Sequence, residues 1–300
     1  MAERTVLALG GHCLLEGEDA DHASQPATIR RTVRRLGPLQ SADRTVVWTH
    51  GNGPQVGNRL LEQAAADTPA HPLDVLVAET QGHLGYLLAR VLDSQWNETA
   101  LPVTTQAVVD ADDPAFESPS KPVGPRYTAA EAERKPFETA PVEGGNAHRR
   151  VVPSPRPQRI VEADAIESLV DRGQSVICGG GGGVPIVETD DGLEGREAVI
   201  DKDHTSALLG RRLDARELVF LTDVPYAYLD YGTDEQRPIE DADPATLREY
   251  LDRGEFGTGS MRPKVDACAR FVAEGGERAI ITTPESVDAA LAGDAGTQIR

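Results

Sequence analysis

The sequence predicts an α/β protein with an open, mainly parallel β-sheet that is covered by helices on both faces. Short apolar runs alternate along the chain with segments in which apolar residues recur at helical spacing, and this alternation is typical of such folds. Several apolar runs end in glycine- or hydroxyl-rich turns, which suits the ligand-binding edge of an open sheet. A chain of 300 residues is long enough for one large unit of this kind with an insertion.

The first half of the chain predicts three strands and two helices. Its strongest helical signal is an apolar periodicity at Leu73, Leu76, Val77, Leu84, Leu87, Leu88 and Val91. The expected elements, in order, are a strand at 5–9, a strand at 44–50, a helix at 55–66, a helix at 72–92 and a strand at 100–109.

The segment 110–158 has a different character. Prolines recur, charges dominate and apolar periodicity is poor. We interpret it as an inserted lobe or lid and not as a domain with a large core of its own.

The alternation then resumes to the end of the chain. The expected elements are a helix at 162–172, a strand at 175–180, a helix at 203–213, a strand at 217–222, helices at 244–253 and 262–274, a strand at 278–282, a helix at 285–292 and a strand at 297–299. Because no fixed-period repeat is visible, repeat architectures are excluded.

Charge and composition exclude several classes of protein. The formal net charge of −19 argues against a DNA- or RNA-binding module, because such a surface repels phosphate backbones. No stretch reaches the roughly 20 apolar residues of a membrane helix, and the N-terminus lacks a signal-peptide layout. Three cysteines without metal-type spacing favour a reducing, cytoplasmic setting.

The basic residues are almost all arginines. Only four are lysines (Lys121, Lys135, Lys202 and Lys264) out of a Lys plus Arg total of 30. An acidic, lysine-poor chain predicts adaptation to high salt, and a GC-rich genome is the alternative explanation. Either pressure replaces lysine where arginine suffices, so each remaining lysine is a candidate for a role that needs a compact charge.

Four of the expected strands end in turns suited to binding an anion. The turns are LALGGHCLL (7–15), WTHGNGPQVGN (48–58), ICGGGGGVP (177–185) and FLTDVPYAY (220–228). Glycine lets the backbone approach a ligand and point its N–H groups at phosphate, although one such turn alone is an ordinary tight turn more often than a site. Neither a P-loop nor a GxGxxG motif is present, so the usual nucleotide fingerprints are absent.

Three lysines lie where they could serve phosphoryl transfer. Lys202 lies between two aspartates in VIDKDH, Lys264 lies near an expected helix start in GTGSMRPKVDA, and Lys121 lies in the insertion. Phosphoryl transfer needs positive charge around a group whose oxygens become more negative. The alternative for each lysine is a solvated surface charge.

These motifs together resemble one known family. GGHCLL, THGNGPQVGN, TQAVVDADDPAFESPSKPVGPRYT, RRVVPSPRPQRIVE, ICGGGGGVP, EAVIDKDHTSALL, LTDVPYAYLDYG and GTGSMRPKVDACARFV are similar to blocks of the carbamate kinases, in the same order. The resemblance runs from about residue 5 to residue 300, and THGNGPQVG and SPSKPVGPRYT are specific to this branch of the amino-acid kinase superfamily.

The resemblance implies a three-layer αβα sandwich, usually a homodimer, formed by a single domain over 1–300 with a protruding subdomain at 112–158. It implies reversible phosphoryl transfer between MgADP and carbamoyl phosphate, which gives MgATP and carbamate during arginine breakdown in the cytoplasm. Mg²⁺ would arrive with the nucleotide, and no protein-bound metal is expected.

The resemblance also assigns roles to individual residues. Lys202 and Lys264 would flank the transferring phosphoryl group, and Asp203 would orient them. The substrate-binding residues would be Gly10, Gly11, His12, Gly51, Asn52, Gly53 and Lys121. The nucleotide-binding residues would be Thr222, Asp223, Val224, Tyr226, Gly259, Ser260 and Met261. Cys13, Cys178 and Cys268 would be buried apolar residues without a catalytic role.

Two positions depart from the family pattern. His12 stands where the family usually has asparagine, and Arg262 stands where it usually has glycine. His12 could change a substrate contact or replace one hydrogen-bond donor by another, and Arg262 could bind phosphate or point into solvent. These changes leave open a related kinase of the same fold that acts on another small carboxylate or carbamoyl acceptor. A non-catalytic nucleotide sensor would be expected to lose Lys202, Asp203 or Lys264, and all three are present.

Overall fold

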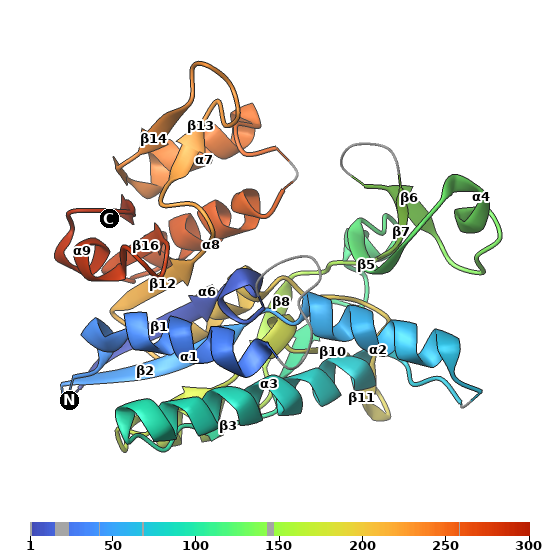
Figure 1. Ribbon diagram of the computed structural model, residues 1–300, viewed down its shortest axis with the longest axis horizontal. Helices are drawn as coiled ribbons and strands as arrows, with labels where there is room; N and C mark the ends of the chain where they lie inside the picture. The colour runs from blue at the N-terminus through green and yellow to red at the C-terminus, as the bar shows by residue number, and fades with distance from the viewer. Residues whose placement is uncertain (1, 16–23, 42, 68, 143–146, 258) are drawn as a thin grey trace.

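Eight strands of the described part of the chain form one central sheet, which confirms the predicted α/β class (Figure 1). The computed structural model describes residues 2–15, 24–41, 43–67, 69–142, 147–257 and 259–300. The strand order is β15-β17-β16-β12-β1-β2-β9-β3, and the neighbouring pairs are parallel except β16 with β17. The strands are β1 (Glu3–Leu9), β2 (Arg44–His50), β3 (Leu101–Pro102), β9 (Val176–Ile177), β12 (Glu217–Leu221), β15 (Asp241–Ala242), β16 (Arg278–Thr282) and β17 (Thr297–Ile299).

Helices cover both faces of this sheet, so the molecule has three layers. Successive side chains of a strand point to opposite faces, and β1 divides its residues accordingly. Val6 and Ala8 pack in one core with residues of α5, α6 and α8, whereas Leu7 and Leu9 pack in a second core with residues of α1, α3 and α9. These helices are α1 (Gln25–Arg35), α3 (Leu73–Trp96), α5 (Ala163–Val170), α6 (Lys202–Arg212), α8 (Met261–Ala273) and α9 (Val287–Ala292).

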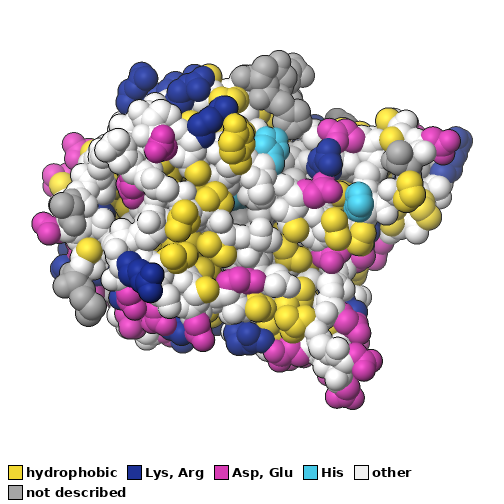
Figure 2. Space-filling view, turned by 90° about the horizontal axis from the view of Figure 1, so that it is seen from below, with side chains coloured by type: hydrophobic (Ala, Val, Ile, Leu, Met, Phe, Trp, Pro, Cys, Tyr) yellow, Lys and Arg dark blue, Asp and Glu magenta, His cyan; other side chains and the backbone are white. Residues whose placement is uncertain are grey.

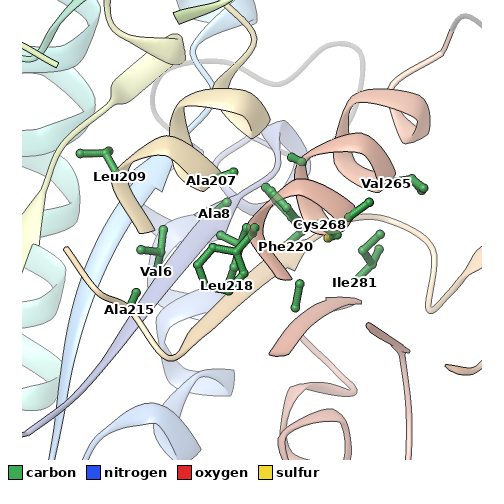
Figure 3. Packing of buried hydrophobic residues seen from close by; sticks show 14 of the residues in the cluster. Val6, Ala8, Ala207, Leu209, Ala215, Leu218, Phe220, Val265, Cys268 and Ile281 are labelled. Atoms are coloured by element: carbon green, nitrogen blue, oxygen red, sulfur yellow. The ribbon is translucent and has the colours of Figure 1, made fainter. Parts of the chain in front are cut away.

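The first core is made of small and large apolar side chains that fit between α6, α8 and the sheet. Figure 3 shows Leu218 and Phe220 of β12 beside Ala207 of α6 and Cys268 of α8. The helix α6 approaches closely because Gly210 faces the ring of Phe271, where a Cβ atom would lie 2.8 Å from a ring carbon. This tight contact fixes how α6 and α8 lie against each other.

Smaller sheets extend the body. A four-stranded sheet has the order β11-β10-β4-β8, formed by β4 (Gln106–Val109), β8 (Pro157–Ile160), β10 (Val184–Thr189) and β11 (Gly192–Gly195). The hairpin of β13 (Ala227–Leu229) and β14 (Arg237–Ile239) lies with α7 (Pro244–Arg253) beyond α8 in Figure 1. The helix α2 (Gly53–Ala65) follows β2.

Residues 121–142 and 147–152 form a lobe that stands apart from the central sheet in Figure 1. It contains an antiparallel sheet in the order β5-β7-β6, together with the one-turn helix α4 (Ala129–Ala132). The strands are β5 (Lys121–Tyr127), β6 (Thr139–Pro141) and β7 (His148–Val152). This lobe lies inside the insertion predicted at 112–158, whose last residues begin β8 and return to the four-stranded sheet.

Two predictions of secondary structure were wrong. The expected strand at 100–109 is two strands in different sheets, because Thr105 leaves the strand to exchange hydrogen bonds with the side chain of Gln81 on α3. The sequence analysis also missed α1, because three of its five buried positions, Gln25, Thr28 and Thr32, are polar. The strands β10, β11, β13 and β14 were missed as well.

No helix of the described residues combines the length and apolar character that crossing a membrane requires.

Leu218→Ala should lower the free energy of unfolding by about 2–5 kcal/mol, because the side chain is fully buried between the sheet and the helices. Leu193→Ala on β11 is the matched control, since that side chain is 48% exposed and its loss should change stability by no more than about 0.5 kcal/mol. Urea unfolding measures both. Equal effects of the two changes would contradict the assignment of the core.

Candidate active site

A cavity of about 660 Å³ lies where β12, β1, β2 and β9 end at their carboxyl termini. These four strands are neighbours in the central sheet, so the turns that follow them meet at one edge. Of the predicted site residues, the cavity is lined by Gly10, Gly11, His12, Gly51, Asn52, Gly53, Lys121, Lys202, Asp203, Thr222, Asp223, Ser260 and Lys264. The structure therefore brings the predicted catalytic and substrate residues together.

Val224, Tyr226, Gly259 and Met261 do not line this cavity. Tyr226 follows the cavity residue Asp223 in the chain. Its ring forms an edge-to-face pair with the ring of Tyr228, with the ring centroids 6.2 Å apart. Met261 is the first residue of α8 and packs against the first core.

A buried carboxylate joins two lysines at the bottom of the cavity. Asp203 accepts hydrogen bonds from the Nζ atoms of Lys202 and Lys264, the second at 3.2 Å. Lys264 also donates to the carbonyl oxygen of Ser260 at 3.0 Å. Asp203 is 2% exposed and Lys264 is 5% exposed. One negative charge thus holds two positive charges in a site from which water is largely excluded.

Burial lowers the pKa of Lys264 below its ordinary value, and the charge of Lys202 lowers it further. Asp203 opposes both effects. A low-dielectric site disfavours the charged amine, and a second ammonium nearby disfavours it again. An anion bound between the two lysines would relieve both penalties, so this arrangement of side chains favours binding of a phosphate.

The start of α6 adds a second lysine–aspartate pair. Asp201 caps the helix by accepting the N–H of Asp203 at 3.0 Å, and it accepts a hydrogen bond from Lys121 Nζ at 2.6 Å. Burial would raise the pKa of Asp201, but Lys121, Lys202 and the backbone N–H lower it well below the usual range. Lys121 belongs to β5, so this ion pair connects the lobe to the helix that carries Lys202.

The glycine turn after β9 supports the cavity wall. Gly181 has φ of +63°, and a Cβ atom there would lie 2.1 Å from the side-chain nitrogen of Asn52. Only glycine accommodates both the left-handed backbone and this contact. Asn52 in turn donates to Thr80 on α3 at 2.9 Å, so its amide holds the turn in place while the residue lines the cavity.

The two departures from the family pattern have different surroundings. His12 lines the cavity, and its Nε2 atom lies 3.1 Å from the sulfur of Cys13. Burial lowers the pKa of His12, Asp223 opposes this, and the lysines add to it, so the surroundings favour the neutral imidazole, which offers one donor and one acceptor. Arg262 does not line this cavity. Its side chain is exposed, as one of the two alternatives expected, and its guanidinium donates to the carbonyl oxygen of Leu251 at the end of α7 at 2.9 Å.

The sequence analysis missed three residues of the site: Arg149, Asp201 and Gly181. Arg149 projects from β7 into the cavity lining and donates to the carbonyl oxygen of Gly124 at 2.9 Å. The block RRVVPSP already contained it, and Asp201 and Gly181 lie in motifs that we had singled out. Their side-chain pairing and backbone fit depend on contacts between distant segments.

All three cysteines are buried and free, as expected for apolar residues without a catalytic role. Burial raises the pKa of Cys13 and of Cys178 to about 12, and it raises the pKa of Cys268 well above the ordinary value. None is therefore an activated thiolate.

Comparisons with known proteins agree with this geometry. The profile of the amino acid kinase family matches residues 3–283. A carbamate kinase of Halobacterium salinarum is 47% identical over 299 residues, which cover 98% of this chain and 97% of that protein. The chain belongs to the carbamate kinase family. Within this family, a carbamate kinase of Pyrococcus furiosus is 41% identical over 312 residues, with 100% of this chain and 99% of that protein covered.

The solved structures lead to the same family. A carbamate kinase from Giardia lamblia bound to AMP-PNP is 37% identical and superimposes with a TM-score of 0.90, covering 99% of this chain and 98% of its own. A protein of Aeropyrum pernix is 39% identical with a TM-score of 0.92 and 99% coverage of both chains.

Proposed function

We propose that this chain transfers a phosphoryl group between carbamoyl phosphate and ADP, giving carbamate and ATP, in a reversible reaction. The observation that carries the proposal is the Lys202–Asp203–Lys264 cluster, which faces the cavity at the starts of α6 and α8. Relatives that are 40–47% identical over nearly the whole chain are carbamate kinases, and this supports the choice of substrate.

The reaction needs electrostatic stabilisation more than acid–base chemistry. In the direction of ATP formation, a terminal oxygen of ADP bonds to phosphorus while the bond from phosphorus to the carbamoyl oxygen breaks. The bonding electrons leave with carbamate, which is already an anion, so no proton has to be moved. Lys202 and Lys264 would stabilise the charge that spreads over the transferring oxygens, and Asp203 would keep both amines in place.

The substrate side would be formed by the glycine turns and by cations of the lobe. The turns at Gly10–Gly11 and Gly51–Gly53 present backbone that a small ligand can approach closely. Lys121 and Arg149 reach the same cavity from β5 and β7, so closure of the lobe would add positive charge around the substrate phosphate. We therefore propose that the lobe acts as a lid.

The nucleotide side would lie beyond the cluster, toward β13 and the start of α8. Thr222, Asp223 and Ser260 are at the cavity wall, while Val224, Tyr226, Gly259 and Met261 continue away from it. The AMP-PNP bound to the Giardia lamblia relative supports nucleotide use in this fold.

The residues present are compatible with Mg²⁺ carried by the nucleotide. Mg²⁺ keeps several waters and commonly uses one or two carboxylates with substrate phosphates. Of the aspartates that line the cavity in the described residues, Asp201 and Asp203 are engaged by lysines, whereas Asp223 accepts a hydrogen bond from Thr222. Asp223 is the side chain that could hold the ion, which would neutralise phosphate charge.

We also propose a homodimer that forms through the outer face of α3. Val75, Gly82 and Tyr86 recur on that face, and Tyr86 is 58% exposed, while Ala78 and Ala89 on the same stripe pack partly against the cores. Figure 2 views the molecule from the side on which α3 lies in Figure 1 and shows hydrophobic side chains gathered near the middle of this face. A second copy would cover them.

Light scattering measures the mass of the protein in solution and tests the dimer. A mass of two chains would support the homodimer, and a mass of one chain would contradict it.

The cellular compartment and the metabolic role of the reaction are inferred from the cysteines and from the family. Three free cysteines suit a reducing compartment, so we place the reaction in the cytoplasm. The family resemblance supports a role in making ATP during arginine breakdown.

The direct test is ATP formation from MgADP and carbamoyl phosphate, measured in molar KCl with a salt-tolerant readout. Turnover would support the proposal. A folded protein that binds ADP without turnover would contradict it and favour a related kinase with another small acid as acceptor. His12→Asn and a screen of small carboxylates would then identify that acceptor.

Lys202→Met and Lys264→Met should each reduce kcat by on the order of a hundredfold, because each removes a charge from the transition state while keeping the length of the side chain. Lys135→Met is the matched control. This substitution removes another of the four lysines. Lys135 lies in the lobe with its Nζ atom 4.3 Å from the centroid of the Tyr127 ring, and it does not line the cavity. Less than a tenfold loss in both cavity variants would contradict the roles assigned to them.

Activity and the midpoint of thermal unfolding should rise as KCl goes from dilute to molar concentration. The chain carries a net charge of −19, and salt screens the repulsion among its carboxylates. Calorimetry and initial rates at fixed pH check this. A midpoint that is equal or higher in dilute buffer would show that the composition reflects the genome and not adaptation to salt.

A further inference from the structure

Outside the cavity, one carboxylate on α8 gathers two arginines and a histidine. Asp266 accepts a hydrogen bond from Arg156 at 2.7 Å and lies 3.2 Å from His204 Nε2, both through Oδ2. Arg270 contacts both oxygens of Asp266 at 3.2 and 3.3 Å. Burial would raise the pKa of Asp266, but His204 and the two arginines lower it well below its usual range. The carboxylate therefore stays charged across the physiological pH range.

The three partners come from different parts of the fold. His204 lies in the first turn of α6, and Arg270 lies one turn along α8 itself. Arg156 belongs to the segment 153–157, which together with 110–120 forms the stem that joins the lobe to the body. The backbone N–H of Arg156 donates to Asp113 at 3.1 Å, so the two halves of the stem are linked at this point.

These parts meet around a small hollow. A space of about 110 Å³ is lined by Arg156, His204, Ala207, Ala267 and Arg270, among others. The stem therefore lies against the groove between α6 and α8, and not only against one of the helices.

The contacts of Asp266 lie near the same helix starts as the Lys202–Asp203–Lys264 cluster, on the side away from the cavity. His204 directly follows Asp203, and Asp266 follows Lys264 by two residues, so the side chains point away from the cavity on the same first turns that carry the reacting cluster. Between these two turns the structure has a bridge on the cavity side, from Lys264 to Asp203, and a second bridge on the outer side, from Asp266 to His204.

We propose that Asp266 is a positioning residue, which through His204 and Arg156 fixes the first turns of α6 and α8 and ties them to the stem of the lobe. The two lysines of the cavity then keep one spacing, and the stem from which the lobe would close keeps one position relative to them. The proposal rests on the phosphoryl-transfer function given above. A displacement of about 1 Å in a reacting group can cost up to a hundredfold in rate, so a bridge of this kind matters even without touching substrate.

The bridge is poorly suited to a purely stabilising role. The Arg156 side chain is 49% exposed, and exposed ion pairs are screened and contribute little to the stability of the fold. An effect on catalysis without an effect on unfolding therefore distinguishes positioning from general support.

Arg156→Gln should lower kcat about tenfold, with the KM for ADP and the midpoint of thermal unfolding nearly unchanged. Arg270→Gln is the matched control, because it removes a cation from the same carboxylate but connects α8 only with itself. It should leave kcat within twofold of the parent protein. Arg156→Lys should recover part of the loss. In a double-mutant cycle, Arg156→Gln and Asp266→Asn should be strongly non-additive, since they break the same contact.

Hydrogen exchange gives a readout that does not depend on turnover. Peptides that cover 201–206 and 261–266 should exchange faster in Arg156→Gln than in Arg270→Gln. If the parent protein has no turnover, the proposed function fails, and exchange alone still tests the bridge. If the parent turns over and Arg156→Gln matches Arg270→Gln in both kcat and exchange, the positioning role of Asp266 is overturned.

Discussion

The pairing of two lysines, one buried and one partly exposed, with one buried aspartate is the constraint on which the arrangement of this site depends. A buried ammonium group is costly, and two of them repel each other, so neither would remain in place without the shared carboxylate of Asp203. Breaking such a cluster by removing one partner leaves an uncompensated charge. The local fold therefore has to hold α6 and α8 at one separation, and the contact of Gly210 with Phe271 shows how closely the helices approach.

The central sheet determines where this cluster opens. Four adjacent parallel strands end at one edge, and each is followed by a turn that leaves space for a ligand. The turn after β9 combines a left-handed backbone at Gly181 with a contact to Asn52, which is itself fixed to α3. Backbone conformation, side-chain amide and helix thus depend on one another, and the cavity wall is rigid on this side.

Much of the fold could be predicted from the sequence, because alternating periodicity is a local signal. The strands β1, β2, β12 and β16 were predicted to within two residues, and the turns after β1, β2 and β12 indicated the edge at which Lys202 and Lys264 meet. What could not be predicted depends on contacts between distant segments. The break at Thr105 is set by Gln81, and the pairing of Lys121 with Asp201 connects residues 80 apart in the chain. The guanidinium of Arg262 donates a hydrogen bond to the carbonyl oxygen of Leu251, and no local sequence pattern predicts this contact.

The lowered pKa of Lys264 has a consequence for the chemical reactivity of the protein. An amine whose pKa is lowered by burial carries more of its neutral form near pH 7, and the neutral form is the nucleophile. The chain has few other lysines with which it would compete. A small amine-directed electrophile that enters the cavity would therefore meet in Lys264 a more nucleophilic amine than an exposed lysine, and a bound anion would oppose this by favouring the charged form. The same burial that prepares this side chain for an anionic ligand makes it vulnerable when the ligand is absent.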